Sequence, residues 1–235
     1  MNKDNLNDCP DFLQDFLFYM ETIKGRSPRT VDGYYIDLRS FIRFLMIDND
    51  LVSDDTDYKE IKIRNASFDL IKNATRTDAM RFLSEFQRNH DNEAKARSRK
   101  VSAIRSFYKY LTVSSGKLSE NPMLNLETPK LRKTLPKYLT LEQALELLTH
   151  IETNFTERDF CIITLFLNCG MRLSELVGIN IDDINFSENE FSIIRKGGNQ
   201  DILVFGDEAR AALLNYMLER EQMNAAEGHE EALFL

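Results

Sequence analysis

Two residues three positions apart carry the strongest chemical signal in the sequence. They are Arg172 and Glu175, within the run Gly170-Met171-Arg172-Leu173-Ser174-Glu175-Leu176. This spacing puts a guanidinium and a carboxylate on one face of a helix, and a guanidinium fork can bind two oxygens of a phosphate. Spacing alone is more typical of an ordinary ion pair on a helix. A functional role therefore needs support from the rest of the chain.

A second signal is the polar run Arg195-Lys196-Gly197-Gly198-Asn199-Gln200. Two β-rich stretches flank it, around Phe191 and around Leu203, so the pattern predicts a hairpin with two cations at its tip. A lysine on an exposed turn is usually only solvated. The tip of a hairpin can also reach into a groove and bring an ammonium group to a phosphate.

A third signal is the segment from Ala94 to Lys109, which contains six basic residues and no acid. Apolar residues alternate with the basic ones at helical spacing, which predicts one core-facing side and one side suited to phosphates. The alternative is a basic face that contacts only solvent. The net charge of −8 does not exclude a nucleic-acid partner, because residues 1–133 carry +3 and residues 134–235 carry −11. Phosphate binding needs only a basic face, since charges are screened beyond about 8 Å.

The elements that would position these residues are mostly helices. Helical spacing of apolar residues predicts helices over about 12–23, 28–46, 78–86, 93–111, 141–148, 157–168 and 209–223. Pro28 after Ser27 marks a helix start, and Thr140 with Gln143 resembles a capping box. The stretch from about 48 to 75 shows no clean period. We expect a mainly α fold with a small β-hairpin or sheet.

The chain is expected to divide into two domains. Residues 1–121 form a small helical bundle, and residues 138–235 form a mixed α/β domain. Between them, residues 122–137 are proline-punctuated and basic from Lys130 onward, as in an interdomain linker.

Composition narrows the function classes further. The three cysteines and three histidines lie at no metal or redox spacing, so we expect no metal site and no cofactor. Cys161 and Cys169 fall in an apolar run, where cysteine acts as a small hydrophobe. The apolar runs are too short to cross a bilayer, and the N-terminus has no signal-peptide pattern. We expect a cytoplasmic protein without a membrane partner.

The order of these segments along the chain resembles the tyrosine recombinases, especially the Xer-type and phage-integrase group. The N-terminal resemblance consists of Ser27-Pro28-Arg29-Thr30, Tyr34, Asp37 and Leu38, followed by Ser98 to Tyr108. Asn121-Pro122, Pro129-Lys130-Leu131 and Leu135-Pro136 are similar to the linker of that family. Gly170 to Leu176 resembles the box around the family's first catalytic arginine.

The resemblance implies a fold and a set of roles. It implies an N-terminal core-binding (SAM-like) domain that binds DNA, followed by the first part of a catalytic domain. Arg172 would be the first catalytic arginine, Lys196 the hairpin lysine that acts as general acid, and Glu175 the supporting acid. In the family, a tyrosine attacks DNA and forms a phosphotyrosine intermediate, and the arginine stabilises the added negative charge. The DNA-binding residues expected from the front domain and the linker are Arg29, Thr30, Tyr34, Arg97, Arg99, Lys100, Arg105 and Lys133.

One departure from the family is large. The resemblance places further histidine and arginine boxes and the nucleophilic tyrosine beyond Leu235, so we expect this chain to bind double-stranded DNA without cleaving it. Tyr216, the only tyrosine after Lys196, lies among apolar residues and is interpreted as a core residue. We expect homo- or hetero-oligomers, with a tetramer on DNA. The alternatives are a non-catalytic DNA-binding regulator or decoy, and a helical protein-interaction domain that does not meet DNA.

Overall fold

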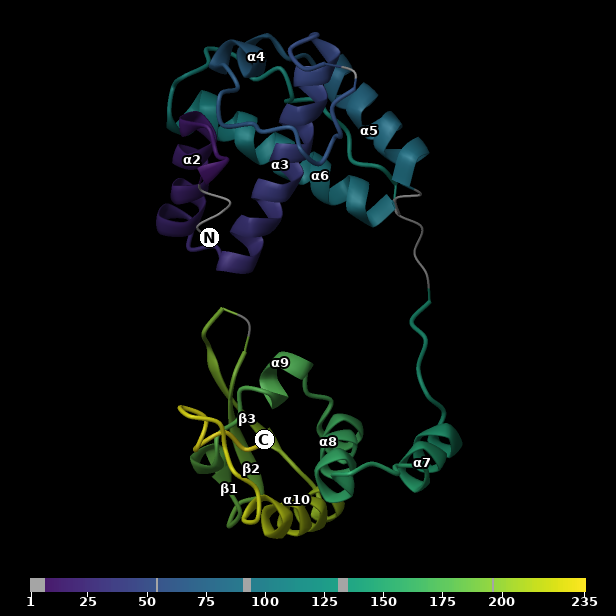
Figure 1. Ribbon diagram of the computed structural model, residues 1–235. Coiled ribbons are helices and arrows are strands. Elements are labelled where there is room, and N and C mark those ends of the chain that lie inside the picture. The colour runs from purple at the N-terminus through teal and green to yellow at the C-terminus, as the bar shows by residue number, and fades with distance from the viewer. Residues whose placement is uncertain (1–6, 54, 91–93, 131–134, 196) are drawn as a thin grey trace. The chain divides into compact units, whose positions relative to one another are not determined.

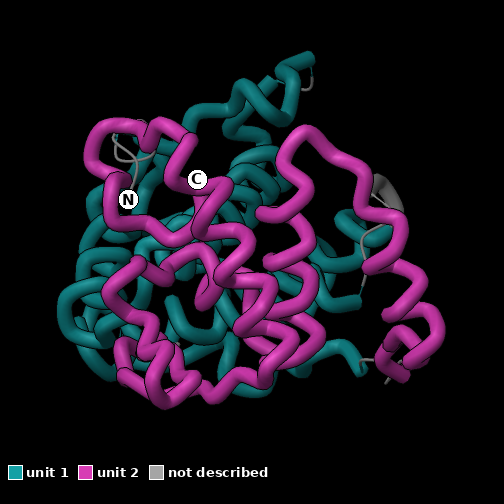
Figure 2. Tube along the Cα trace, turned by 90° about the horizontal axis from the view of Figure 1, so that it is seen from below, with its two compact units in different colours: residues 1–134 teal, residues 135–235 magenta. Residues whose placement is uncertain are grey.

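The structure is a computed structural model, and it describes residues 7–53, 55–90, 94–130, 135–195 and 197–235. The chain divides into two compact units, Met1–Thr134 and Leu135–Leu235. Figure 1 labels the helices and strands, and Figure 2 colours the two units separately. Each unit has its own hydrophobic core.

Unit 1 is helical. Its elements are α2 (Asp11–Phe18) with a π-helical turn (Tyr19–Ile23), α3 (Pro28–Asp48), α4 (Phe68–Asn73), α5 (Arg76–His90) and α6 (Ala94–Lys109) with a second π-helical turn (Tyr110–Ser114) (Figure 1). Helix α3 starts at Pro28 after Ser27, as predicted, because proline lacks only an N–H that the first turn leaves unused. The start of α5 lies earlier than predicted. The Asp78 carboxylate accepts a hydrogen bond from the Thr75 backbone N–H, and the Thr75 hydroxyl oxygen accepts one from the Asp78 backbone N–H. These two bonds set the helix start at Arg76.

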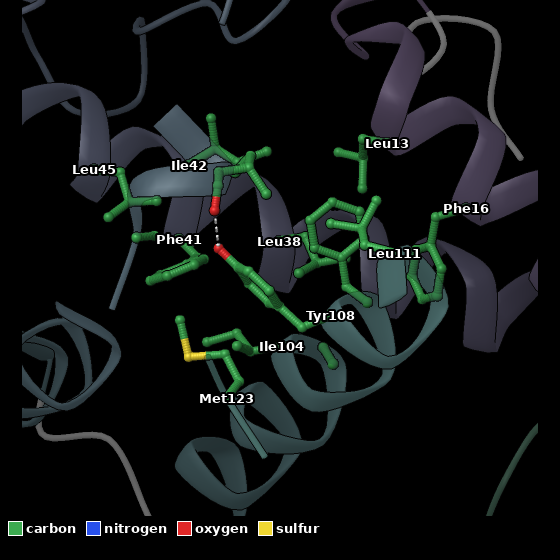
Figure 3. Packing of buried hydrophobic residues seen from close by; sticks show 14 of the residues in the cluster. Leu13, Phe16, Leu38, Phe41, Ile42, Leu45, Ile104, Tyr108, Leu111 and Met123 are labelled. Atoms are coloured by element: carbon green, nitrogen blue, oxygen red, sulfur yellow. Dashed lines mark hydrogen bonds between the residues drawn. The ribbon is translucent and has the colours of Figure 1, made fainter. Parts of the chain in front are cut away.

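The core of unit 1 lies between α2, α3, α5 and α6, and Figure 3 shows part of it. Tyr108 of α6 is fully buried there, and its hydroxyl donates to the carbonyl oxygen of Ile71 at 2.8 Å (Figure 3). This bond ties α6 to the otherwise aperiodic stretch after α3, which adds Ile63 and Ile71 to the core. Helix α6 is thereby held with its apolar side inward. On α5, Ala79 and Phe82 are buried, whereas Met80 is exposed.

Unit 2 combines helices with a small sheet. Its elements are α7 (Leu141–Thr149), α8 (Thr156–Cys169), α9 (Leu173–Leu176), a 3-10 turn (Ile181–Asp183), β1 (Ile184–Asn185), β2 (Glu190–Ile194), β3 (Gln200–Val204) and α10 (Asp207–Arg220). The strands are antiparallel in the order β1-β2-β3. Helices α8 and α10 pack against each other, and Phe191 and Ile193 of β2 complete their core.

The hairpin of β2 and β3 brings Ile194 opposite Gln200, so Arg195 is the first residue beyond the paired strands. Gly197 and Gly198 both have positive φ angles, which glycine adopts without steric cost. The mainly α fold with a small antiparallel sheet is therefore confirmed, although β1 was not predicted. In the described residues, no helix is both long and apolar enough to span a membrane.

Candidate active site

Arg172 stands at the turn between α8 and α9. Gly170 ends α8 with a φ of 62°, and Met171 buries its side chain in the core of unit 2. The backbone at Arg172 is extended, and its carbonyl oxygen accepts the first hydrogen bonds of α9. A buried anchor on one side and a helix start on the other thus fix the Arg172 backbone, while its side chain remains 64% exposed.

Glu175 holds Arg172 by two bonds. The Arg172 guanidinium (Nη1) donates to Glu175 Oε1 at 2.5 Å, and the Arg172 backbone N–H donates to Oε2 at 2.8 Å. The Glu175 side chain is only 3% exposed. The backbone bond from Arg172, together with its guanidinium, lowers the pKa of Glu175 below its usual range. The pair is more than a helix-surface ion pair, because the carboxylate fixes both the backbone and the charged end of Arg172.

The hairpin contributes a further cation. Arg195 Nε donates to Asp201 Oδ2 at 2.5 Å, and Arg195 Nη1 lies 4.0 Å from Glu175 Oε1. Arg172 and Arg195, from different elements, therefore both lie near one carboxylate oxygen. The expected general acid, Lys196, lies outside the described residues, so its role remains a prediction.

The basic helix α6 divides its cations between the core and the surface. Lys100 is 4% exposed, and its Nζ donates to Asp37 Oδ1 of α3 at 3.0 Å. The same ammonium lies 4.1 Å from the centre of the Phe86 ring. Burial raises the pKa of Asp37, although Lys100 and Arg99 oppose that shift. The ammonium of Lys100, predicted to bind DNA, is thus enclosed between α3, α5 and α6 and paired with Asp37.

Arg99 lies at the edge of that ion pair and at the surface. Its Nη1 is 2.6 Å from Asp37 Oδ2 and donates to the carbonyl oxygen of Gly33 at 3.2 Å. Half of its side chain remains exposed. Asp37 therefore serves two neighbouring cations, one buried and one facing outward.

Arg105 lines a separate cavity beside the C-terminal end of α6. This open cavity of about 480 Å³ is lined partly by the apolar residues Val113, Met123 and Leu124 and partly by polar and charged residues, which are Ser102, Arg105, Ser106, Lys109, Thr112 and Asn121. Arg105 and Lys109 are exposed. Such a mixture of cations and neutral donors is suited to phosphate oxygens.

The remaining predicted DNA contacts are placed as follows. Arg29 and Thr30 are exposed in the first turn of α3, where the Thr30 and Ser27 hydroxyls are 3.0 Å apart. Tyr34 is half-buried and stacks on Phe16. Arg97 is half-buried on α6. Lys133 lies outside the described residues.

Two site residues were not identified from the sequence. Asp37 is an acid within the apolar stripe of a long helix, and that position was a signal of a buried ion pair. Arg195 was noted only as one of two cations at a hairpin tip. Arg195 and Glu175 are 20 positions apart in the sequence, so no local sequence pattern reveals that they lie close together. Tyr216, interpreted as a core residue, is fully buried, and its hydroxyl donates to the carbonyl oxygen of Leu233 at 2.9 Å.

Comparisons with known proteins converge on one family. Residues 137–235 match the model of the phage integrase family. The chain is 42% identical over 226 residues to the tyrosine recombinase XerC of Caldanaerobacter subterraneus, a match that covers 96% of this chain and 63% of that protein. It is 28% identical to the tyrosine recombinase XerD of Listeria monocytogenes, with 96% and 70% of the two chains covered. The chain thus spans somewhat less than two thirds of the XerC relative.

Solved structures give the same fold. A recombinase XerH bound to a palindromic difH substrate matches with a TM-score of 0.67 and 16% identity, covering 99% of this chain and 63% of that one. A lambda integrase dimer bound to a COC′ core site matches with a TM-score of 0.61 and 13% identity, covering 87% and 67%. These structures show that the chain shares their fold, and the sequence matches show that it is similar to the Xer-type tyrosine recombinases, with residues 137–235 matching the phage integrase family.

Proposed function

We propose that this chain takes part in site-specific DNA recombination, with unit 1 as a DNA-binding domain and unit 2 as part of a catalytic domain. One observation carries the proposal: Arg172 is exposed while a buried Glu175 fixes both its backbone and its guanidinium. An arginine held in this way loses little freedom when it binds a phosphate. The solved structures named above are bound to a difH substrate and to a COC′ core site, and a Tn1549 transposon integrase of similar fold is in complex with circular intermediate DNA, which supports DNA as the partner.

Arg172 would stabilise the reacting phosphate. When a nucleophilic tyrosine attacks phosphorus, the non-bridging oxygens gain negative charge. A preorganised guanidinium fork can donate to them, and the loss of one such donor costs about 10²–10³ in rate. Glu175 would position this arginine, because one of its oxygens accepts from the Arg172 guanidinium and the other from the Arg172 backbone N–H. Lys196, as general acid, would protonate the departing 5′ oxygen.

Unit 1 would contribute affinity for DNA. Arg29, Arg99 and Arg105 are exposed on α3 and α6, and each can neutralise a phosphate. Lys100 is not part of this proposal, since its ammonium is buried against Asp37. Arg97 and the hydroxyls of Thr30 and Tyr34 remain proposed contacts, as does Lys133. We also expect several copies, up to a tetramer, to assemble on one DNA site.

Equilibrium binding to duplex DNA across a range of salt concentrations tests the first half of the proposal. Wild-type protein should bind at low salt and weaken steeply as salt rises. Exchange of Arg99 and Arg105 for glutamine should reduce the salt slope by about two units, one for each lost phosphate contact. Absence of any complex at low salt would refute DNA binding and leave the protein-interaction domain as the alternative.

Covalent capture on a nicked suicide duplex tests the second half, with the natural chain used if it is longer than these 235 residues. Arg172→Ala should lower adduct formation by about two to three orders of magnitude while the protein stays folded. An Arg172→Ala protein that forms the adduct at the wild-type rate would remove Arg172 from the mechanism. DNA binding without any adduct would favour the non-catalytic regulator.

A further inference from the structure

Arg195 occupies an unusual position in unit 2. It is the first residue after β2, and its backbone N–H and carbonyl oxygen bond to Asn199 and Gly198 across the turn. The base of the hairpin turn therefore fixes where its side chain starts. From there its guanidinium lies beside Asp201 of β3 and within 4.0 Å of Glu175 of α9.

The donors of Arg195 are mostly unused. Its Nε donates to Asp201, but its two terminal nitrogens make no hydrogen bond to any residue that the structure describes; the 4.0 Å to Glu175 is an ion-pair distance only. The Glu175 oxygen nearest to it already accepts from Arg172 at 2.5 Å. Because Arg195 has unused donors and lies near Arg172, the two guanidinium groups can bind one anion together.

The contact with Asp201 is easily exchanged. The Arg195 and Asp201 side chains are 38% and 49% exposed, and such surface ion pairs contribute little to stability. Glu175 is different, because it is buried and bonded to the Arg172 backbone, so it cannot move away. When an anion arrives, Asp201 is the partner that Arg195 can release.

We propose that Arg195 is a second phosphate-binding arginine of the Arg172 site, and that Asp201 occupies it while DNA is absent. The proposal rests on the proposed function, since it takes the phosphate at Arg172 to belong to duplex DNA. On binding, the DNA phosphate replaces the Asp201 carboxylate at Arg195 Nε and also accepts from the terminal nitrogens that Asp201 leaves unused. No covalent bond changes in this exchange. Asp201 therefore competes with DNA, and Arg195 adds one phosphate contact to the complex.

Four variants of the 235-residue chain test this with fluorescence anisotropy on a labelled duplex at several salt concentrations. Arg195→Gln should weaken binding and reduce the salt slope by about one unit. Asp201→Asn should tighten binding, because the competitor is removed. The double variant R195Q/D201N keeps the net charge of the wild type and should still show the reduced slope. Lys117→Gln is the matched control, since Lys117 and Asp15 form an ion pair of similar exposure, 38% and 51%, in unit 1. It should leave the slope unchanged.

The outcomes distinguish a failure of DNA binding from a failure of the role proposed for Arg195. Wild-type protein that binds no DNA refutes the proposed function, and this inference with it. Wild-type binding with an unchanged slope in both R195Q and the double variant refutes the role of Arg195 alone. If D201N weakens binding as much as R195Q does, Arg195 acts only as a link within the hairpin. If K117Q lowers the slope equally, the effect is one of net charge. Circular dichroism and thermal melting establish that each variant is folded.

Discussion

Lys100 and Asp37 form an ion pair inside unit 1, with 3.0 Å between the ammonium nitrogen and the carboxylate oxygen Oδ1. Both side chains are almost completely buried. Two buried charges lose their hydration, and good pairing geometry is needed to offset that cost. The Phe86 ring, 4.1 Å from the ammonium, adds a cation–π contact to the pair. The pair joins α3 to α6, so it fixes the helix that carries six basic residues and no acid.

Lys100→Met and Arg99→Gln should therefore behave in opposite ways. Lys100→Met leaves a buried carboxylate with one partner fewer and should cost about 3 kcal/mol of the free energy of unfolding. It should not change the salt slope of DNA binding, since the ammonium reaches no phosphate. Arg99→Gln removes an exposed charge, so it should cost less than about 1 kcal/mol and lower the slope by about one unit.

Urea unfolding and DNA titrations at several salt concentrations measure these two effects. Asp37→Asn removes the charge that both cations share, so it should destabilise the protein. The salt slope of DNA binding, measured for the folded protein, should stay nearly unchanged. A stable Lys100→Met protein with a lower slope would place Lys100 on the DNA.

Glu175→Gln should reveal the depressed pKa of Glu175. A carboxyl group whose folded pKa lies below its unfolded value stabilises the fold above the unfolded pKa, and the stabilisation is lost as pH falls through the folded pKa. At pH 7 the wild type should melt at a higher temperature than Glu175→Gln. The gap should narrow as pH falls below about 4, the usual range of glutamate.

Thermal melts of both proteins between pH 2 and pH 8 provide the comparison. Asp50→Asn, in an exposed loop, is the control and should follow the wild type throughout. A constant gap over the whole range would mean that the loss in Glu175→Gln arises from packing and not from charge.

The sequence predicted most of the elements because local signals define them. Pro28 after Ser27, the Thr140–Gln143 capping box and the paired glycines of the hairpin all act within a few residues, and each lies where expected. It also predicted that Arg172 and Glu175 act together, since they are only three positions apart.

What the sequence did not predict depends on contacts between distant segments. Lys100 and Arg99 are adjacent and chemically alike, yet one is buried and one exposed because Asp37, 63 residues from Lys100, lies opposite α6. The role of Arg195 requires α9 and the hairpin to lie side by side. β1 has only two residues, Ile184 and Asn185, so it is too short to produce an alternating pattern.

Limited proteolysis should separate the two units. We expect the first cuts within residues 122–137, where the boundary between the compact units falls and where lysines and arginines offer trypsin sites. Helix α8 packs against α10 and should be cut late. Mass spectrometry of the earliest fragments identifies the sites. A first cut at Arg158, inside α8, would contradict the division into two domains.

Tyr216→Phe should lower stability without affecting DNA binding. The Tyr216 hydroxyl donates to the carbonyl oxygen of Leu233 and accepts from the backbone N–H of Leu235 at 3.2 Å. Its ring stacks on Phe234 with 5.0 Å between centroids, and burial raises the pKa of its hydroxyl. Loss of the hydroxyl should cost about 1 kcal/mol, because two backbone groups lose their partner.

Tyr138→Phe is the matched control, since Tyr138 is exposed and should show no change in stability. A buried, hydrogen-bonded phenol cannot reach a phosphate, so neither variant should alter DNA affinity or any covalent adduct on a nicked duplex. If an adduct forms and disappears in Tyr216→Phe alone, Tyr216 is the nucleophile and its burial is relieved on DNA.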